Sequence, residues 1–290
     1  MASVAEGRAI QTSVLQSPAL AALGVPHGFS TRHGGHSSGI FASLNFGNPG
    51  DLPADRRDPP GNIRSNWGVL ASSIGREMPA AAQGLGERRV VEVHQVHGAA
   101  VCVVRAGRPA PSDVAGQDTK ADAIVTDDPG RFVAIRVADC APVLIASGDG
   151  DIVAAIHAGW RGVVAGAAAA AINEMKAVGA DPGAMRAAVG PCIRADAFEV
   201  GPDVAAEFQR VFGAGTPHIR PASAHEKSLV DLKGAIRQQL LACGLASSNV
   251  DVLPYCTVRD GADFFSHRRE KGLTGRMVGI IGPKAPGAGS

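Results

Sequence analysis

Cys140, His157 and His97 are the residues of this sequence whose types and positions best suit chemistry. Cys140 stands in the run Ala-Asp-Cys-Ala-Pro, and His157 opens the run His-Ala-Gly-Trp-Arg-Gly. A thiolate beside an imidazole suits either a soft-metal site or a nucleophile–base pair. Adding His97 gives three protein ligands, which leave a fourth position for water or substrate, as in a catalytic zinc site. The residues alone leave both interpretations open.

Plainer roles exist for each of these side chains. A lone buried cysteine commonly acts as a small hydrophobic residue, and a lone histidine as a hydrogen-bonded core or surface residue. His94 lies three residues before His97. In a strand the two rings would face opposite sides, so only one should point at the site.

A β-hairpin is the element expected to bring Cys140 and His157 together. Residues 142–147 and 152–156 are apolar, and the run Gly-Asp-Gly-Asp at 148–151 between them is typical of a turn. One strand leads away from Cys140 and the other returns to His157. Because paired strands lie roughly 5 Å apart, we expect the two residues within about 10 Å of each other.

The remaining pattern predicts an α+β fold, as a single domain of mixed β-sheets with hairpins, flanked by helices. Strands are expected at 89–93, 99–104, 122–125, 132–137, 185–189, 249–253, 264–270 and 276–281. Helices are expected at 62–74, 163–178, 202–212 and 232–243, so residues 157–162 should form a strand-to-helix turn. We expect an N-terminal lead-in at 1–26, the catalytic domain at 27–282 and a frayed tail at 283–290.

Composition and charge exclude several classes of protein. The 290 residues carry a net charge of +1, which gives no long-range attraction to nucleic acid or to an anionic membrane. The five cysteines are odd in number and widely spaced, which argues against a disulfide framework. No run approaches the roughly 18 apolar residues of a membrane span, and the N-terminus lacks the apolar core of a secretory signal. We therefore expect a cytoplasmic protein.

Several polar residues near these motifs are candidates for contacting a substrate. Arg161 follows His157 closely and either holds an anion near the following helix or caps loop carbonyls at the surface. Arg268, beside Arg269, either binds phosphate bidentately or belongs to a solvated strand edge. Arg32 and Asn45 lie in an N-terminal Gly- and Ser-rich region.

Asp139 precedes Cys140 and is a candidate proton carrier, with a turn-forming role as the alternative. Cys192 and Cys256 both follow strand ends marked by proline, but the sequence does not show whether they approach the same site.

The motifs together resemble those of the laccase-domain family, also called polyphenol oxidase or multicopper oxidase-like proteins. Members are also described as purine nucleoside phosphorylases and as peptidoglycan editing factors. The matching segments run in the expected order at 28–32, 43–45, 95–98, 121–123, 138–140, 157–162, 190–193 and 265–269. The loop at 49–61 departs from the family's pattern by being longer and richer in proline.

This resemblance implies a Zn²⁺ site formed by His97, Cys140 and His157. It also implies phosphorolysis of adenosine, inosine, guanosine and methylthioadenosine, together with deamination of adenosine. Purine nucleosides and phosphate would then be the partners. In deamination, zinc would lower the pKa of its bound water to about 7, and the resulting hydroxide would attack the purine C6.

Other functions remain as alternatives. Cys140 as nucleophile and His157 as base would make an amidase that edits a peptidoglycan precursor, a UDP-MurNAc-amino acid. A non-catalytic protein that binds a metal or a nucleotide is a third hypothesis. A copper laccase is disfavoured because the nine histidines form no His-x-His pair and no methionine lies in the motifs, although adventitious Cu²⁺ binding is expected.

Overall fold

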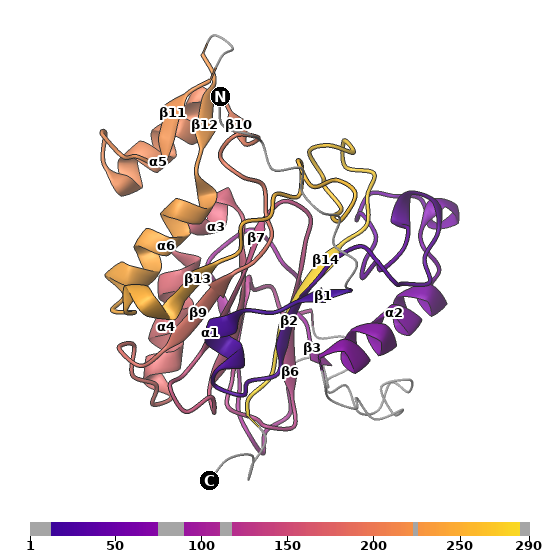
Figure 1. The fold of residues 1–290 in the computed structure, drawn as a ribbon, viewed down its shortest axis with the longest axis horizontal. Coiled ribbons are helices and arrows are strands. Elements are labelled where there is room, and N and C mark those ends of the chain that lie inside the picture. The colour runs from indigo at the N-terminus through magenta and orange to yellow at the C-terminus, as the bar shows by residue number, and fades with distance from the viewer. Residues whose placement is uncertain (1–12, 75–89, 111–117, 223–225, 285–290) are drawn as a thin grey trace.

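A computed structural model describes residues 13–74, 90–110, 118–222 and 226–284 of the chain. It confirms an α+β fold, in which two large mixed sheets pack face to face (Figure 1). Parts of the predicted lead-in at 1–26 and of the predicted tail at 283–290 lie outside the described residues. Among the described residues, no helix has both the length and the hydropathy needed to cross a bilayer.

The first sheet has five strands in the order β1-β2-β14-β6-β3. Their bounds are β1 Val14–Leu15, β2 His27–Ser30, β14 Met277–Ile281, β6 Phe132–Val137 and β3 Val90–Val91. β14 pairs antiparallel with both β2 and β6, whereas β3 runs parallel to β6. The centre of this sheet therefore joins segments that are far apart in the sequence.

The second sheet has six strands in the order β13-β9-β7-β8-β5-β4. Their bounds are β13 Val250–Val252, β9 Arg186–Val189, β7 Ala141–Ala146, β8 Val153–Ala158, β5 Ala123–Thr126 and β4 Val101–Val104. The outer pairs β13–β9 and β4–β5 are parallel, and the inner pairs are antiparallel. This mixture confirms the expectation of mixed sheets.

The predicted hairpin is confirmed as the pair β7–β8. Pro142 lies opposite His157, and Ala141 lies opposite Ala158. Gly150 in the turn has a φ of 83°, in the left-handed region that glycine adopts without steric cost. Every residue of both strands is buried, so the hairpin lies inside the molecule. It fixes Cys140 and His157 at the same end of the hairpin.

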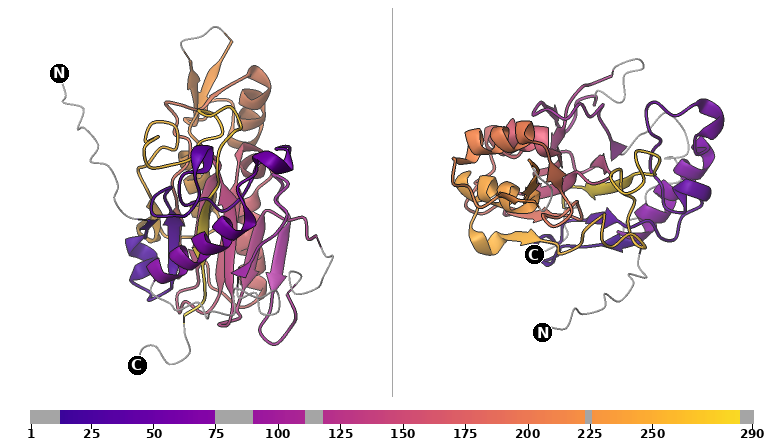
Figure 2. Two further views of the ribbon diagram at one scale, coloured as in Figure 1. Left: turned by 90° about the vertical axis from the view of Figure 1, so that its right-hand side faces the viewer. Right: turned by 90° about the horizontal axis from the view of Figure 1, so that it is seen from above.

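Helices cover the outer faces of both sheets. Their bounds are α1 Pro18–Ala21, α2 Pro60–Ser73, α3 Trp160–Val164, α4 Ala167–Ala177, α5 Pro202–Phe212 and α6 Leu232–Ala242. Ile135 and Leu144 belong to the core between the sheets. Leu70 of α2 packs on the outer face of the first sheet, and Ile172 and Ile236 of α4 and α6 pack on that of the second. Figures 1 and 2 show α2 on one side of the two large sheets and α4 and α6 on the other.

A third, small sheet lies with α5 at the top of Figure 1. Its strands are β10 Glu199–Val200, β12 Ser228–Val230 and β11 Ile219–Pro221, paired antiparallel. Short 3-10 helices cover Gly39–Phe41, Ala54–Arg56 and Ser247–Asn249.

The helix predicted at 163–178 differs from the structure. It is two helices, because Gly166 adopts a φ of 81° between α3 and α4 and interrupts the helical backbone. α3 also begins earlier than expected, at Trp160. Since His157 and Ala158 still belong to β8, the predicted strand-to-helix turn contracts to Gly159.

The strand predicted at 264–270 is wrong. This segment forms turns, in which Phe264 and Phe265 are fully buried. The carboxylate of Glu270 accepts hydrogen bonds from the Ser266 amide at 2.9 Å and from the Arg269 guanidinium at 2.8 Å. These local bonds replace strand pairing, and only the following segment, β14, enters the sheet.

Candidate metal centre

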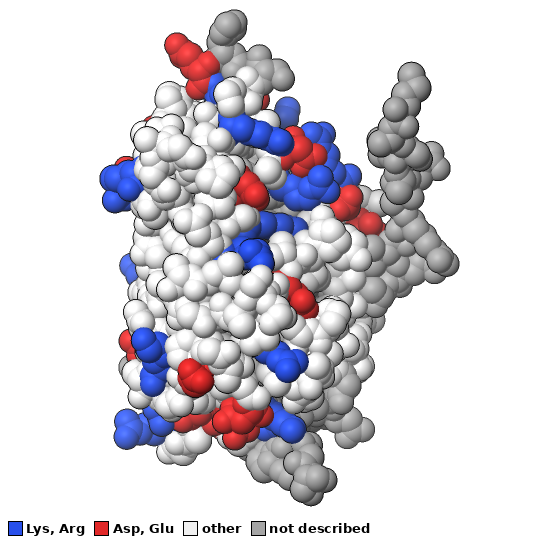
Figure 3. Space-filling view, turned by 60° about the vertical axis from the view of Figure 1, so that its left-hand side comes forward, with Lys and Arg blue, Asp and Glu red and all other residues white. Residues whose placement is uncertain are grey.

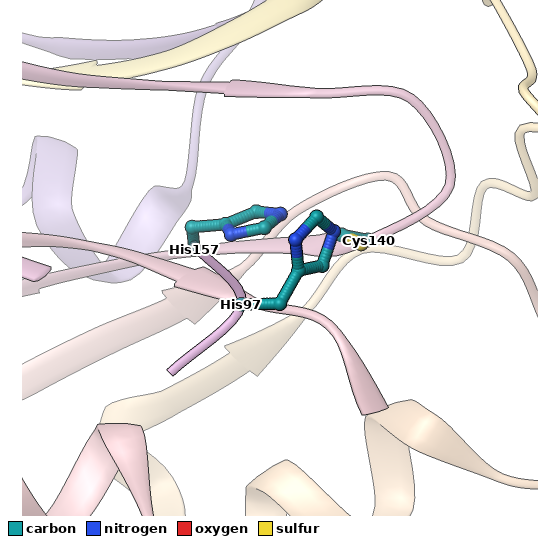
Figure 4. A group of neighbouring side chains, drawn as sticks. All are labelled: His97, Cys140 and His157. Carbon is teal, nitrogen blue, oxygen red and sulfur yellow. The ribbon is translucent and has the colours of Figure 1, made fainter. Parts of the chain in front are cut away.

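His97, Cys140 and His157 come together at one end of the second sheet (Figure 4). One ligand atom from each residue lies within 4.8 Å of the other two. The two imidazole rings meet edge to face, with centroids 4.8 Å apart. Within the described ranges, this is the one cluster of three or more His, Cys, Asp or Glu residues close enough to share a metal. The prediction that the three residues converge is confirmed.

Strand pairing explains the convergence. The register of β7 and β8 places Cys140, just before β7, beside the end of β8 that carries His157. β5 pairs with β8, and β4 pairs with β5. The segment that contains His97 precedes β4 and is therefore carried to the same edge.

Asp122 is the residue that fixes the geometry of the centre. It is fully buried, and its Oδ1 accepts a hydrogen bond from His157 Nδ1 at 2.8 Å. Because a carboxylate only accepts, the proton of the neutral ring resides on Nδ1 and Nε2 is left as the metal-binding atom. The same carboxylate accepts from the amides of His97 at 2.8 Å and Gly98 at 2.6 Å.

Two backbone features make room for the ligands. His97 has a φ of 61°, in the left-handed region, and the bond from its amide to Asp122 stabilises this conformation. Gly159 lies against the cluster, and a Cβ there would be 2.8 Å from Cys140 Sγ and 3.2 Å from His97 Cδ2. The glycine in the His-Ala-Gly-Trp motif is therefore required for space rather than for a turn.

The thiol of Cys140 and the ring of His157 each shift the pKa of the other. Burial opposes ionisation of Cys140, but the charge on His157 and hydrogen bonds from both histidines outweigh it and lower the pKa of the thiol to about 6. Burial also opposes the charge on His157, but the Cys140 thiolate and Asp122 raise the pKa of this ring to about 9. Without a metal, the site therefore holds a thiolate–imidazolium pair at neutral pH.

The donor set fits Zn²⁺. Two imidazole nitrogens and one thiolate are ligands that zinc prefers, and bonds of roughly 2.0–2.3 Å place tetrahedral ligand atoms about 3.5 Å apart. His97 is exposed, Cys140 is half-buried and His157 is buried. The centre is therefore open on its His97 side.

Asp139, the candidate proton carrier, is buried beside Cys140 with a φ of 83°. Both of its carboxylate oxygens accept hydrogen bonds at 2.6 Å, one from the Thr257 hydroxyl and the other from the Arg268 amide. The carboxylate thus ties the segment before Cys140 to two C-terminal segments.

Arg32 and Arg268 both use their guanidinium groups in contacts within the protein. Arg32 donates from Nε to the carbonyl of Ala42 at 2.9 Å and lies 3.6 Å from Glu270. Arg268 is exposed and donates from Nη1 to the carbonyl of Glu199 at 3.0 Å.

Arg161 and Asn45 differ in exposure. Arg161 is exposed, and its guanidinium lies 4.5 Å from the centre of the Trp160 ring. Asn45 is fully buried, and its side chain bonds to Asp58 at 2.8 Å and to the amide of Arg276 at 2.8 Å.

His94, Cys192 and Cys256 lie outside the cluster. His94 is exposed and its ring pairs with Asp118 at 2.9 Å. It forms an isolated β-bridge with Lys120. Cys192 and Cys256 are fully buried and pair with each other in a parallel β-bridge. Burial raises the pKa of Cys192 to about 12.

Charged side chains of both signs are interspersed on the side of the molecule that carries α4 and α6 (Figure 3). A pocket of about 310 Å³ is lined in part by Arg194, Asp196, Arg220, Asp231 and Lys233. None of its lining residues belongs to the metal cluster, so the pocket and the cluster are separate.

Three residues near the centre were not predicted from the sequence as site residues. Asp122 lies in a recognised motif, but its role depends on donors from distant segments. Arg136 lies in β6, and Arg276 immediately precedes β14, the neighbouring strand of the first sheet. Their sequence signal was a charged residue within or next to an otherwise apolar strand.

Comparisons with known proteins agree with the fold. The protein named purine nucleoside phosphorylase from Deinococcus radiodurans is 38% identical over 93% of this chain and 92% of its own. The purine nucleoside phosphorylase YlmD from Geobacillus stearothermophilus is 34% identical over 89% of this chain and 90% of its own. The crystal structure of YlmD from that organism superposes with a TM-score of 0.79 and 31% identity, covering 96% of this chain and 98% of that one.

The family described as "Multi-copper polyphenol oxidoreductase laccase" matches residues 26–284. This range contains all three residues of the metal cluster and every motif that carried the resemblance in the sequence. The chain therefore belongs to the multi-copper polyphenol oxidoreductase laccase family.

Proposed function

We propose that this protein is a zinc-dependent purine nucleoside phosphorylase. The cluster of His97, Cys140 and His157 carries the proposal, because its donors suit zinc and one side of it is open. The names of the relatives from Deinococcus radiodurans and Geobacillus stearothermophilus support it. The substrates would be adenosine, inosine, guanosine and methylthioadenosine, with phosphate as the second substrate.

Phosphorolysis replaces one bond at the ribose. A phosphate oxygen bonds to C1′ while the bond from C1′ to the purine N9 breaks. The electron pair of that bond stays with the base, which takes up a proton, so the products are ribose 1-phosphate and the free purine. The transition state has oxocarbenium character, as in glycoside cleavage.

The residues around the cluster have separate roles in this proposal. His97, Cys140 and His157 would hold Zn²⁺, which when bound supplies Lewis-acid polarisation and lowers the pKa of water. Arg161, which is exposed on the first turn of α3, is the best placed of the sequence candidates to contact substrate. Asp139 holds the segment before Cys140 in place, because both of its oxygens already accept hydrogen bonds.

Arg32, Arg268 and Asn45 support the walls of the site in this proposal. Arg32 and Arg268 donate to main-chain carbonyls of neighbouring segments. Asn45 is fully buried and acts through the loop that it organises.

Adenosine deamination is the second activity that we propose at this centre. Water adds at C6 of the adenine ring and ammonia leaves, giving inosine. His157 would remain fixed by Asp122 throughout, which keeps its Nε2 directed at the centre.

Product analysis tests both activities together. The purified protein is incubated with adenosine and phosphate, and the products are separated by chromatography. Adenine reports phosphorolysis, inosine reports deamination, and we expect both to disappear in Cys140→Ala. Cys243→Ala is the matched control, because Cys243 is a half-buried cysteine at the end of α6. The proposal fails if neither product forms, or if Cys140→Ala retains full activity.

A thiol amidase is the second candidate, and one observation favours it. The thiolate of Cys140, the ring of His157 and the carboxylate of Asp122 form a chain of nucleophile, base and orienting acid. Such an enzyme would cleave an amide in a peptidoglycan precursor such as a UDP-MurNAc-amino acid. Zinc would block its thiolate, so a chelator would raise amidase activity and abolish phosphorolysis.

The non-catalytic and copper hypotheses have less support. Tight nucleoside binding without turnover would identify a binding protein. A laccase needs a cluster of several coppers, whereas the described residues offer one cluster of three donors, and the sequence has no His-x-His pair. Copper bound to this cluster is expected to be adventitious, because Cu²⁺ has high affinity for such ligands.

A further inference from the structure

Arg136 and Arg276 lie side by side at one end of the first sheet. Arg136 is the penultimate residue of β6, and Arg276 immediately precedes β14. Val278 of β14 is opposite Arg136, so Arg136 and Arg276 point to the same face of the first sheet. Both lie at the end of β6 from which the chain continues to Cys140.

Gly47 leaves room for the side chains of Arg136 and Arg276. An ideal Cβ on Gly47 would be 3.3 Å from Cδ and Nη1 of Arg136 and 3.5 Å from Cγ of Arg276. The amides of Gly47 and Arg276 both donate to Asn45 Oδ1, at 3.1 and 2.8 Å. The absence of a side chain at Gly47 therefore lets both arginines pass beneath this loop.

The positive charge of this pair is only partly balanced. Among the described residues, Arg136 has one carboxylate partner, Glu92, at 3.3 Å. In the described part of the chain, no carboxylate lies within 4.0 Å of the Arg276 guanidinium, which donates from Nη1 to the carbonyls of Thr274 and Gly275. Burial lowers the pKa of Arg276 and the charge on Arg136 lowers it further, while Cys140, Asp139 and Asp51 raise it. Two adjacent guanidinium groups thus share one close counter-charge.

We propose that Arg136 and Arg276 bind the oxyanion of the phosphate substrate beside the His97–Cys140–His157 cluster. The inference rests on the proposed phosphorylase function. Arginine presents paired N–H donors that match a phosphate bidentately, and two arginines on one face can hold two of its edges. Nε and Nη2 of Arg276 make no hydrogen bond to other described residues, so they are available to a ligand.

The position of Arg136 is coupled to that of the metal ligands. Gln95, two residues before His97, donates to the carbonyl of Arg136 at 2.8 Å and accepts from its amide at 2.8 Å. This bracket fixes the distance between the arginine pair and the loop that supplies His97. A bound phosphate would therefore be held in a constant position relative to the cluster.

Binding of inorganic phosphate to the full chain tests the site directly. Isothermal titration calorimetry is performed without nucleoside on the wild type, Arg136→Gln, Arg276→Gln and Arg276→Lys. We expect each glutamine variant to weaken phosphate binding by about tenfold to a hundredfold, because each removes charged hydrogen bonds. Arg276→Lys should fall between, since it keeps the charge and loses the paired donors. Arg210→Gln, on the exposed side of α5, is the control and should bind like the wild type.

Unchanged phosphate affinity in both glutamine variants would overturn the site, as would an affinity that depends on Arg161 instead. Circular dichroism checks that each variant is folded, and the half-exposed Arg136 provides a test if Arg276→Gln does not fold. Phosphate binding through the two arginines without nucleoside cleavage would leave the site standing and refute the phosphorylase function. Phosphorolysis with an unaltered KM for phosphate in both variants would refute the site and leave the phosphorylase function standing.

Discussion

The carboxylate of Asp122 connects two of the three residues in the candidate metal centre. It accepts from the ring of His157 and from the backbone amides of the His97 segment, and it is fully buried. A single side chain therefore fixes both the tautomer of one ligand and the backbone of another. Loss of such an outer partner commonly reduces metal affinity by about 10–100-fold.

Asp122→Asn should weaken zinc binding by about that factor, because an amide leaves the tautomer of His157 unspecified and removes the charge that the amides near His97 bind. Competition with a chromophoric chelator measures the change. Asp118→Asn is the matched control, since Asp118 forms an equivalent pair with His94 at 2.9 Å but is exposed. Equal zinc affinities in the two variants would show that Asp122 does not position the ligands.

Cys140 should be the most reactive cysteine of the metal-free protein. Its pKa is lowered to about 6, so the thiolate persists from neutral pH down to about pH 6 and declines below it. Burial raises the pKa of Cys192 to about 12, and Cys192 should remain unlabelled. Peptide mass spectrometry after brief iodoacetamide treatment gives the rates, and zinc should protect Cys140. Faster labelling of Cys192, or no protection by zinc, would contradict this assignment.

The residues of the cluster were predictable, whereas those that orient it were not. Cys140 and His157 flank a local hairpin, and strand pairing of neighbouring segments can be read from the sequence. Asp122 is bonded to His157, 35 residues further along the chain. No local pattern encodes such a contact, because it arises only when β5 and β8 pair.

Among the elements, the junction of α3 and α4 shows how backbone conformation overrides composition. The run after Gly162 is rich in alanine and predicts one helix. Gly166 interrupts it with a φ of 81°, so that α3 follows directly from β8 and α4 packs on the second sheet. A glycine inside a helical pattern does not reveal which sign of φ it adopts.

Gly166→Ala should lower the free energy of unfolding by about 1 kcal/mol, because L-residues are strained in the left-handed region. A methyl group there would meet no atom within 4 Å, so the backbone alone sets the cost. Gly68→Ala is the matched comparison: Gly68 is exposed inside α2 and is equally free of neighbours. This change should stabilise the protein by about 0.5–1 kcal/mol.

Urea denaturation of both variants measures the two free energies. Equal effects at Gly166 and Gly68 would mean that the break between α3 and α4 is absent in solution.

At the scale of the whole molecule, the candidate metal centre depends on pairings between distant parts of the chain. β14 lies between β2 and β6, and β4 reaches the centre only through β5 and β8. The α+β class followed from the mixture of elements in the sequence. The parallel strand pairs at the sheet edges could not be predicted, because the sequence of a short apolar strand does not indicate which strand it pairs with.

This arrangement sets two charged features beside each other. The cluster of His97, Cys140 and His157 lies at the edge of the second sheet, and Arg136 and Arg276 lie at the corresponding end of the first. The centre is open on the exposed His97 side. The two-sheet architecture thus sets the candidate metal ligands and the proposed anion site at the same end of the two sheets.

The most direct test of a single catalytic zinc centre is phosphorolysis measured against zinc content in the same samples. Metal-free protein is reloaded in steps, zinc is determined by mass spectrometry, and release of ribose 1-phosphate from inosine is followed. We predict that activity rises in proportion to zinc and saturates at about one ion per chain, as three protein ligands with one open position imply. Highest activity in the metal-free protein, or activity that requires copper, would contradict the account.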